Sequence, residues 1–102
     1  MGNNIPKEVA EIVQSIFSQL IDKSKYKTFF FGSRVSGKAG ERADTDVAVY
    51  GDTPLDTETL FNIKESFDNS NTLYSIDFVD LNTTSESFRD HVLSGATLPV
   101  FS

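Results

Sequence analysis

Apolar residues recur at intervals of three and four between Pro6 and about Lys23, the spacing that brings side chains onto one face of a helix. Asn4 is a candidate N-cap residue, and Pro6 suits the first helical turn. The pattern therefore predicts an amphipathic helix near the N-terminus. Its apolar stripe consists of Val9, Ile12, Val13, Ile16, Phe17, Leu20 and Ile21.

Three later segments are rich in β-branched and aromatic residues, which favour strands. They cover residues 26–31, 45–50 and about 73–81. The first ends at Gly32 and Ser33, and turn residues also follow the second. We therefore predict three strands.

Two further helices are predicted between the strands. Residues 33–38 suit one short helical turn, and residues 56–67 suit a longer helix. In the longer helix the spacing turns Leu60, Phe61 and Phe67 toward the core.

A last helix is predicted after the third strand. Thr83 and Glu86 have the spacing of a capping box, in which each residue satisfies a free backbone N–H of the other. Phe88 and Val92 lie four residues apart on one face, and Gly95 is a suitable end for the helix.

The order of these elements is helix, strand, short helix, strand, helix, strand, helix. A chain of 102 residues can bury one modest core, so we expect a single domain over residues 1–102. We predict an α+β fold in which a small mixed β-sheet packs on helices.

Composition and charge narrow the function. The absence of cysteine excludes disulfides, cysteine-based zinc sites and a thiol nucleophile. A formal charge of −6 disfavours direct binding to nucleic acid or to an anionic membrane. Because there is neither a signal-peptide pattern nor an apolar run long enough to span a bilayer, we expect a cytoplasmic protein.

Three aspartates are candidates for metal binding. Asp44 and Asp46 begin the second predicted strand, and the strand period of two turns both side chains to the same face. Asp77 adds a third carboxylate if the third strand is a neighbour. Three ionised carboxylates about 4 Å apart would repel by roughly 4 kcal/mol per pair, so either some hold protons or divalent cations lie among them. We favour two Mg²⁺ ions, with Mn²⁺ as an alternative, since such ions can bridge triphosphate oxygens.

Gly32 and Ser33 supply a candidate phosphate-binding turn. Glycine lets the backbone approach a phosphate closely, and N–H groups at the start of a helix point toward such an anion. The nearby cations Arg34, Lys38 and Arg42 would offset the charge of a triphosphate. Alternatively, these three cations form a solvated loop that balances the neighbouring acids.

Together these motifs resemble the minimal nucleotidyltransferases of the DNA polymerase beta superfamily. The resemblance is carried by residues 32–37, 44–49 and 76–81, and it extends from the first helix to Gly95. The spaced Gly-Ser and Asp-x-Asp combination is more specific than either part alone. The resemblance implies a polymerase beta-like nucleotidyltransferase fold.

The same resemblance implies an activity and a role for each residue. The activity would be Mg²⁺-dependent transfer of a nucleoside monophosphate, with AMP from ATP expected. Gly32 and Ser33 would hold the triphosphate, Asp44 and Asp46 would bind both metal ions, and Asp77 would bind one ion and help to activate the acceptor. Relatives of this type are paired with HEPN-domain proteins, so a HEPN-type toxin modified by this chain is the expected partner.

Other interpretations stay open at this point. The chain could be a non-catalytic, nucleotide-binding antitoxin or regulatory subunit that acts by complex formation. Residues 32–38 match a Walker A loop, but Ala39 lacks the hydroxyl that Mg²⁺ requires there. Separately, the Gly-Ser pair could be an ordinary turn, and Asp44 with Asp46 a solvated strand end.

Several other residues are assigned by position. Asp80 points away from Asp77 and is expected to be structural, and His91 is expected to be a partly exposed helix residue without a catalytic role. The run 29–31 contains three phenylalanines, which leaves one ring for stacking on a base. The apolar tail from Val92 to Phe101 is a candidate partner surface.

Overall fold

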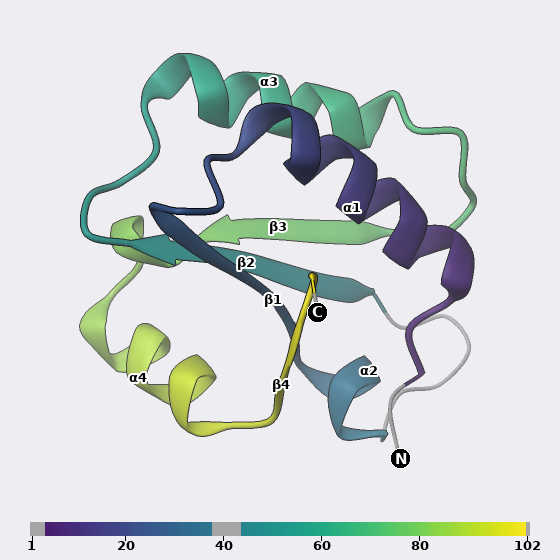
Figure 1. Ribbon diagram of the computed structural model, residues 1–102. Coiled ribbons are helices and arrows are strands. Elements are labelled where there is room, and N and C mark those ends of the chain that lie inside the picture. Colours follow the sequence, from purple (N-terminus) through teal and green to yellow (C-terminus); the bar gives the residue numbers. More distant parts are fainter. Residues whose placement is uncertain (1–3, 38–43, 102) are drawn as a thin grey trace.

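The computed structural model describes residues 4–37 and 44–101. These residues form one four-stranded sheet in the order β3–β2–β1–β4 (Figure 1). β1 is antiparallel to both β2 and β4, whereas β2 and β3 are parallel. The predicted small mixed sheet is therefore confirmed. The strands are β1 (Tyr26–Phe31), β2 (Thr45–Gly51), β3 (Ile76–Asp80) and β4 (Thr97–Pro99).

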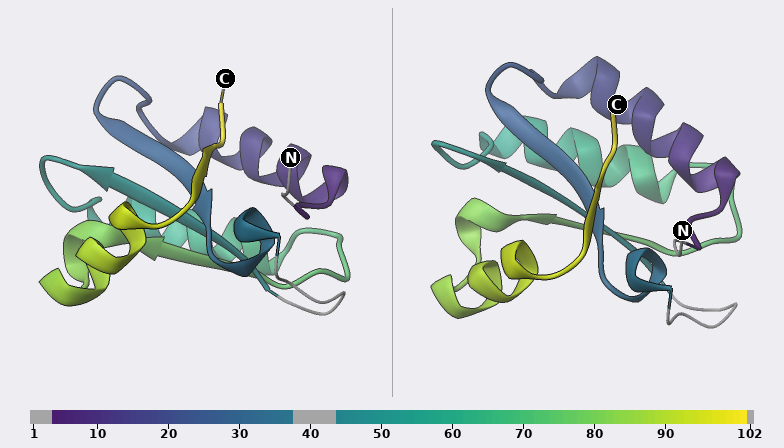
Figure 2. Two further views of the ribbon diagram at one scale, coloured as in Figure 1. Left: turned by 90° about the horizontal axis from the view of Figure 1, so that it is seen from below. Right: turned by 60° about the horizontal axis from the view of Figure 1, so that its bottom comes forward.

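Helices cover the sheet unequally. α1 and α3 lie side by side on one face, α4 lies on the other face at one end, and α2 lies beyond the opposite end (Figures 1 and 2). The face that carries α4 is therefore only partly covered. None of the described helices combines the length and apolar character that a bilayer span requires. The helices are α1 (Lys7–Leu20), α2 (Ser33–Ser36), α3 (Thr57–Asp68), the 3₁₀ helix η1 (Leu81–Thr83) and α4 (Glu86–Ser94).

Strand alternation divides the core between the two faces of the sheet. Val47 and Val49 pack with α1 and α3 in the larger cluster, and Ala48 packs in the smaller cluster under α4. The Phe17 ring meets those of Phe67 and Phe78 edge to face, with centroids 5.9 and 5.7 Å apart. Each fully buried side chain of this size contributes roughly 2–3 kcal/mol, so α1 and α3 hold the sheet mainly through these contacts.

The last strand, β4, corrects the prediction of three strands. β4 pairs with β1, and Val100 N–H donates to the Thr28 carbonyl at 3.1 Å. Val92 and Val100 are buried and Leu98 and Phe101 are partly buried against the core, whereas Leu93 is 44% exposed, so only part of this tail is available as the predicted partner surface. A strand of three residues that contains Pro99 has no local signal, because its pairing depends on a distant edge.

Two predicted helix caps are wrong. Asn4 does not cap α1, whose N-cap position is Pro6 without a side-chain hydrogen bond. The Asn4 backbone is instead tied to Arg34, through Asn4 N–H to the Arg34 carbonyl at 2.6 Å. Ser85, not Thr83, caps α4 by accepting from the Phe88 N–H at 3.1 Å. Gly95 does end α4, as predicted.

One residue predicted to face the core is exposed, and one predicted strand begins later than expected. Phe61 is 60% exposed, because the buried stripe of α3 runs through Leu60, Ile63 and Phe67 instead. Leu73 is fully exposed, because β3 begins only at Ile76. The sequence pattern therefore predicted α3 correctly but placed Phe61 on the wrong face of it. It also predicted β3 correctly but began that strand too early.

Asp80 has the structural role expected of it. It is 3% exposed, and its two carboxylate oxygens accept hydrogen bonds from the backbone N–H groups of Leu55 and Asn82, both at 2.9 Å. It therefore ties the end of β3 to the segment that leads into α3.

We predict that Asp80→Ala will lower the free energy of unfolding by about 3 kcal/mol, because two backbone donors lose their charged acceptor in a buried place. Urea denaturation measures this loss. The exposed Asp52→Ala is the matched control and should change stability by no more than about 0.5 kcal/mol. Equal losses in the two variants would contradict the assigned role of Asp80.

Candidate active site

The parallel pairing of β2 with β3 puts two of the predicted carboxylates side by side. Asp46 and Asp77 are direct register partners, so both side chains lie on one face of strands about 5 Å apart. On its other side Asp46 is the register partner of Phe31. Asp44, which is exposed, lies just before β2. The sheet thus carries a row of Asp77, Asp46 and Phe31 on the face that is only partly covered.

The electrostatics show that the other two carboxylates act on Asp46. Burial raises the pKa of Asp46 from 3.8 to about 6, with further contributions from the charges of Asp77 and then Asp44. A half-buried carboxylate next to two others is costly to ionise without a compensating cation. The described part of the site is therefore poorly suited to carry its negative charge without a cation.

The donor set suits a hard divalent cation. Carboxylate oxygens are the ligands that Mg²⁺ and Mn²⁺ prefer, and the raised pKa of Asp46 indicates that a positive charge would be stabilised there. Among the described residues, however, no three acidic or histidine side chains are already placed to hold one ion. The chemistry of the residues fits the ion, and binding requires the carboxylates to converge further.

Gly32 connects the acid row to the predicted phosphate-binding turn. It has φ 83° and ψ −162°, a conformation that is strained for residues with a side chain. A Cβ atom at this position would overlap Oδ2 of Asp46. The backbone at Gly32 therefore lies directly against the Asp46 carboxylate, as close as only glycine allows.

Ser33 is the first residue of α2 and is exposed. The Gly32 carbonyl accepts from the N–H groups of Val35 and Ser36, both at 3.1 Å, which starts the helix at this turn. The structure thus brings the predicted phosphate-binding pair, Gly32 and Ser33, to one side of the acid row, with Gly32 against Asp46.

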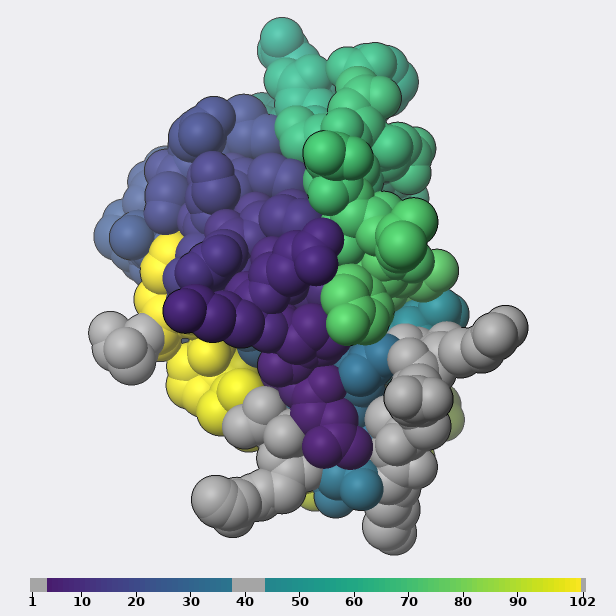
Figure 3. All heavy atoms as spheres, turned by 90° about the vertical axis from the view of Figure 1, so that its right-hand side faces the viewer, coloured from purple at the N-terminus to yellow at the C-terminus, as the bar shows by residue number. Residues whose placement is uncertain are grey.

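Of the three cations predicted to bind phosphate, the structure describes Arg34. Arg34 is 5% exposed; its Nη1 donates to the Asn4 carbonyl at 2.8 Å, and its guanidinium lies over the Tyr74 ring. Figure 3 shows the N-terminal segment beside α2, where this contact is made. Arg34 therefore has a structural role that the sequence did not indicate, and its binding of phosphate stays a prediction. Lys38 and Arg42 lie outside the described residues.

A groove of about 440 Å³ adjoins the acid row on the side of α4. Asp46 and Asp77 form one end, Val79 lies on the sheet below, and the rings of Phe31 and Phe88 line it. These two rings meet edge to face with centroids 6.4 Å apart. Phe31 belongs to the run predicted to offer a ring for stacking, but the contribution of Phe88 depends on where α4 packs and has no sequence signal.

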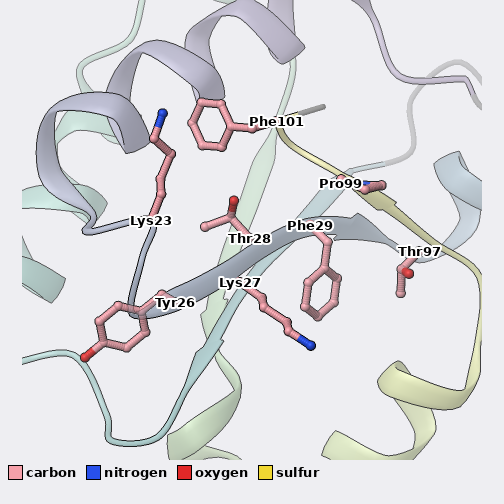
Figure 4. A pocket seen from close by; sticks show the side chains of 8 residues that line it. All are labelled: Lys23, Tyr26, Lys27, Thr28, Phe29, Thr97, Pro99 and Phe101. Atoms are coloured by element: carbon pink, nitrogen blue, oxygen red, sulfur yellow. The ribbon is translucent and has the colours of Figure 1, made fainter.

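A second hollow, of about 390 Å³, lies along β1 and β4 (Figure 4). Lys23 and Phe101 lie at one part of it, with the Lys23 ammonium 4.2 Å from the Phe101 ring centroid, and Lys27 lies at another. It contains Phe29 of the phenylalanine run but none of the predicted metal-binding or phosphate-binding residues. The acid row and its groove are therefore the candidate active site.

Known proteins resemble this chain in sequence and in fold. The family described as polymerase beta nucleotidyltransferase matches residues 13–99. A relative from Haemophilus influenzae, named probable protein adenylyltransferase MntA, is 39% identical over 87 residues, which cover 85% of this chain and 75% of the relative.

Two solved structures share the fold. One is a toxin–antitoxin crystal structure with AMP-PNP, with a TM-score of 0.62 and 20% identity. The other is a mutant of the toxin–antitoxin MntA–HpeT, with a TM-score of 0.63 and 17% identity. Each match covers 91% of this chain and 73% of the other chain.

We predict that neutralising Asp46 will stabilise the metal-free protein. Its folded pKa of about 6 lies above the ordinary 3.8, so the folded chain retains a proton that the unfolded chain releases, and stability falls as the pH rises through this window. After allowance for solvent screening the ionisation costs about 1–2 kcal/mol. Asp46→Asn should therefore raise the free energy of unfolding at pH 7 by about 1 kcal/mol and have little effect at pH 4.

Denaturation curves at both pH values provide the measurement. Asp52→Asn, which removes an exposed acid elsewhere, should leave the pH dependence unchanged. A lower stability of Asp46→Asn at pH 7 would show that the carboxylate is already compensated within the protein.

Proposed function

This chain belongs to the polymerase beta nucleotidyltransferase family, and we propose that it transfers an adenylyl group from ATP to an acceptor held by a partner protein. The single observation that carries the proposal is the register pairing of Asp46 with Asp77 directly against Gly32. That pairing puts candidate metal ligands and a candidate phosphate-binding turn in contact.

In this proposal each residue has a separate task. Asp44, Asp46 and Asp77 would hold two Mg²⁺ ions, which supply charge stabilisation to the triphosphate and lower the pKa of the attacking hydroxyl. Gly32 lets the backbone approach the leaving phosphates, and the Ser33 hydroxyl adds a hydrogen bond. Asp77 orients the acceptor hydroxyl at the end of the row that faces solvent.

The partner is proposed from the relatives. One is named a protein adenylyltransferase, and two with the same fold are parts of toxin–antitoxin assemblies, one of them with AMP-PNP. We infer that the present chain is an antitoxin that modifies its toxin, and that this toxin is of the HEPN type. A short chain with one partly open sheet face suits this role, since the partner can close that face.

A second candidate function is silencing by complex formation alone. It is favoured by one observation, namely that no three acidic or histidine side chains of the described residues are grouped so that they could hold one ion. The presence of all three aspartates and the positive φ of Gly32 against Asp46 favour the enzyme, because neither feature is needed for a surface that only binds a partner.

We predict that ATP labelled at the α-phosphate, with Mg²⁺, will transfer label to the partner, and that Asp44→Asn with Asp46→Asn will lower the rate at least about 100-fold, since the charge that holds the metals is lost. Gel autoradiography of the purified complex measures the transfer. Asp52→Asn with Glu58→Gln removes the same charge from exposed positions elsewhere and should retain full activity.

The double mutant also separates the two candidate functions. Its binding to the partner should be unchanged, as measured by calorimetry, but it should no longer neutralise the partner in cells. Full neutralisation by a mutant without transfer activity would instead establish the binding function.

A further inference from the structure

The groove beside the acid row lies on the side away from the phosphate-binding turn. Along the strands, Gly32 lies beyond the row on the side of α2, whereas Val79 and Phe88 lie on the side of α4. Figure 1 shows the same separation, with α2 and α4 at opposite ends of the sheet, and both views of Figure 2 agree. Any group bound between Asp46 and Asp77 therefore has the turn on one side and the groove on the other.

This placement constrains where the second substrate can enter. In phosphoryl and nucleotidyl transfer the attacking and leaving oxygens lie roughly in line through phosphorus. If the leaving pyrophosphate lies on Gly32, the attacking hydroxyl must come from the opposite side. We propose that the groove between Phe31 and Phe88 is the acceptor site, and that it takes a hydroxyl side chain on an apolar segment of a protein. This inference rests on the proposed function.

The walls of the groove favour a protein segment over a nucleic acid end. Among the described residues that line it, Asp46 and Asp77 are charged and none is basic. Arg89, the nearest basic residue along α4, donates instead to the carbonyls of Leu81 and Thr84. Apart from the two proposed metal ligands, the described lining is apolar: it offers no basic side chain to the phosphates of a polyanionic acceptor, whereas the Phe31 and Phe88 rings favour apolar side chains.

Phe88 is the residue that selects the acceptor. It is 41% exposed although it is large and apolar, so it has unused surface toward the groove. Phe31 lies deeper, packed against the smaller core cluster, and fixes the position of Phe88 through the edge-to-face contact. A protein segment that covers the two rings would bring its hydroxyl to the end of the groove formed by Asp77.

The reaction at this site balances. The acceptor oxygen forms a bond to the α-phosphorus of ATP, the bond from that phosphorus to the pyrophosphate oxygen breaks, and pyrophosphate leaves on the side of Gly32. The hydroxyl proton passes to solvent. No oxidant, reductant or further co-reactant is needed.

The test uses ¹⁵N-labelled full chain with Mg²⁺ and AMP-PNP, titrated with the peptide acetyl-Leu-Ser-Leu-amide or with triadenylate bearing a free 3′-hydroxyl. The peptide should shift the amide signals of Phe31, Asp77, Val79 and Phe88, and triadenylate should not. Phe88→Ala should weaken peptide binding at least about fivefold while the affinity for AMP-PNP changes less than about twofold. Phe61→Ala, which removes another exposed ring, should change neither affinity.

Three results would overturn the assignment of the acceptor site. They are the absence of peptide shifts at the groove, preferential binding of triadenylate there, and a loss of AMP-PNP affinity in Phe88→Ala, which would make the groove a base-binding site. Failure of the chain to bind AMP-PNP would contradict the proposed function instead. The peptide titration would still test whether the groove binds a protein segment.

Discussion

The cost of ionising a half-buried carboxylate beside two others is the constraint around which this site is organised. The parallel pairing of β2 and β3 sets Asp46 opposite Asp77, and burial together with its two acidic neighbours raises the pKa of Asp46 to about 6. A domain of this size is stable by only about 5–10 kcal/mol, so the cost of ionising Asp46 is a substantial part of what the core must offset. The packing of α1 and α3 on the far face of β2 and β3 does this without covering the acids.

The Asp46 carboxylate also restricts the backbone of the turn beside it. Gly32 adopts a backbone conformation that leaves no room for a side chain, and the Asp46 carboxylate occupies the space where a Cβ would lie. The turn and the acid row therefore form one unit, in which the start of α2 and the carboxylate of β2 are fixed relative to each other. α4 covers only the far end of that face, which leaves the row and its groove accessible to a nucleotide and a partner.

The local features of this structure could be predicted from the sequence, because they depend on period and turn residues. The spacing of Asp44 and Asp46, the glycine turn after β1 and the structural role of Asp80 all follow from neighbours along the chain. The pairing of Asp46 with Asp77 was conditional on strand order, which no local pattern contains. β4 and the burial of Arg34 were missed for the same physical reason: both depend on contacts with residues far along the chain.

The central claim is that these carboxylates converge on divalent ions opposite the glycine turn. Anomalous diffraction from crystals grown with Mn²⁺ and AMP-PNP would test it most directly. The account predicts manganese peaks bound by Asp46 and Asp77, with the terminal phosphates of the analogue against Gly32 and Ser33. Bound analogue with its phosphates elsewhere, or manganese absent from the acid row, would contradict it.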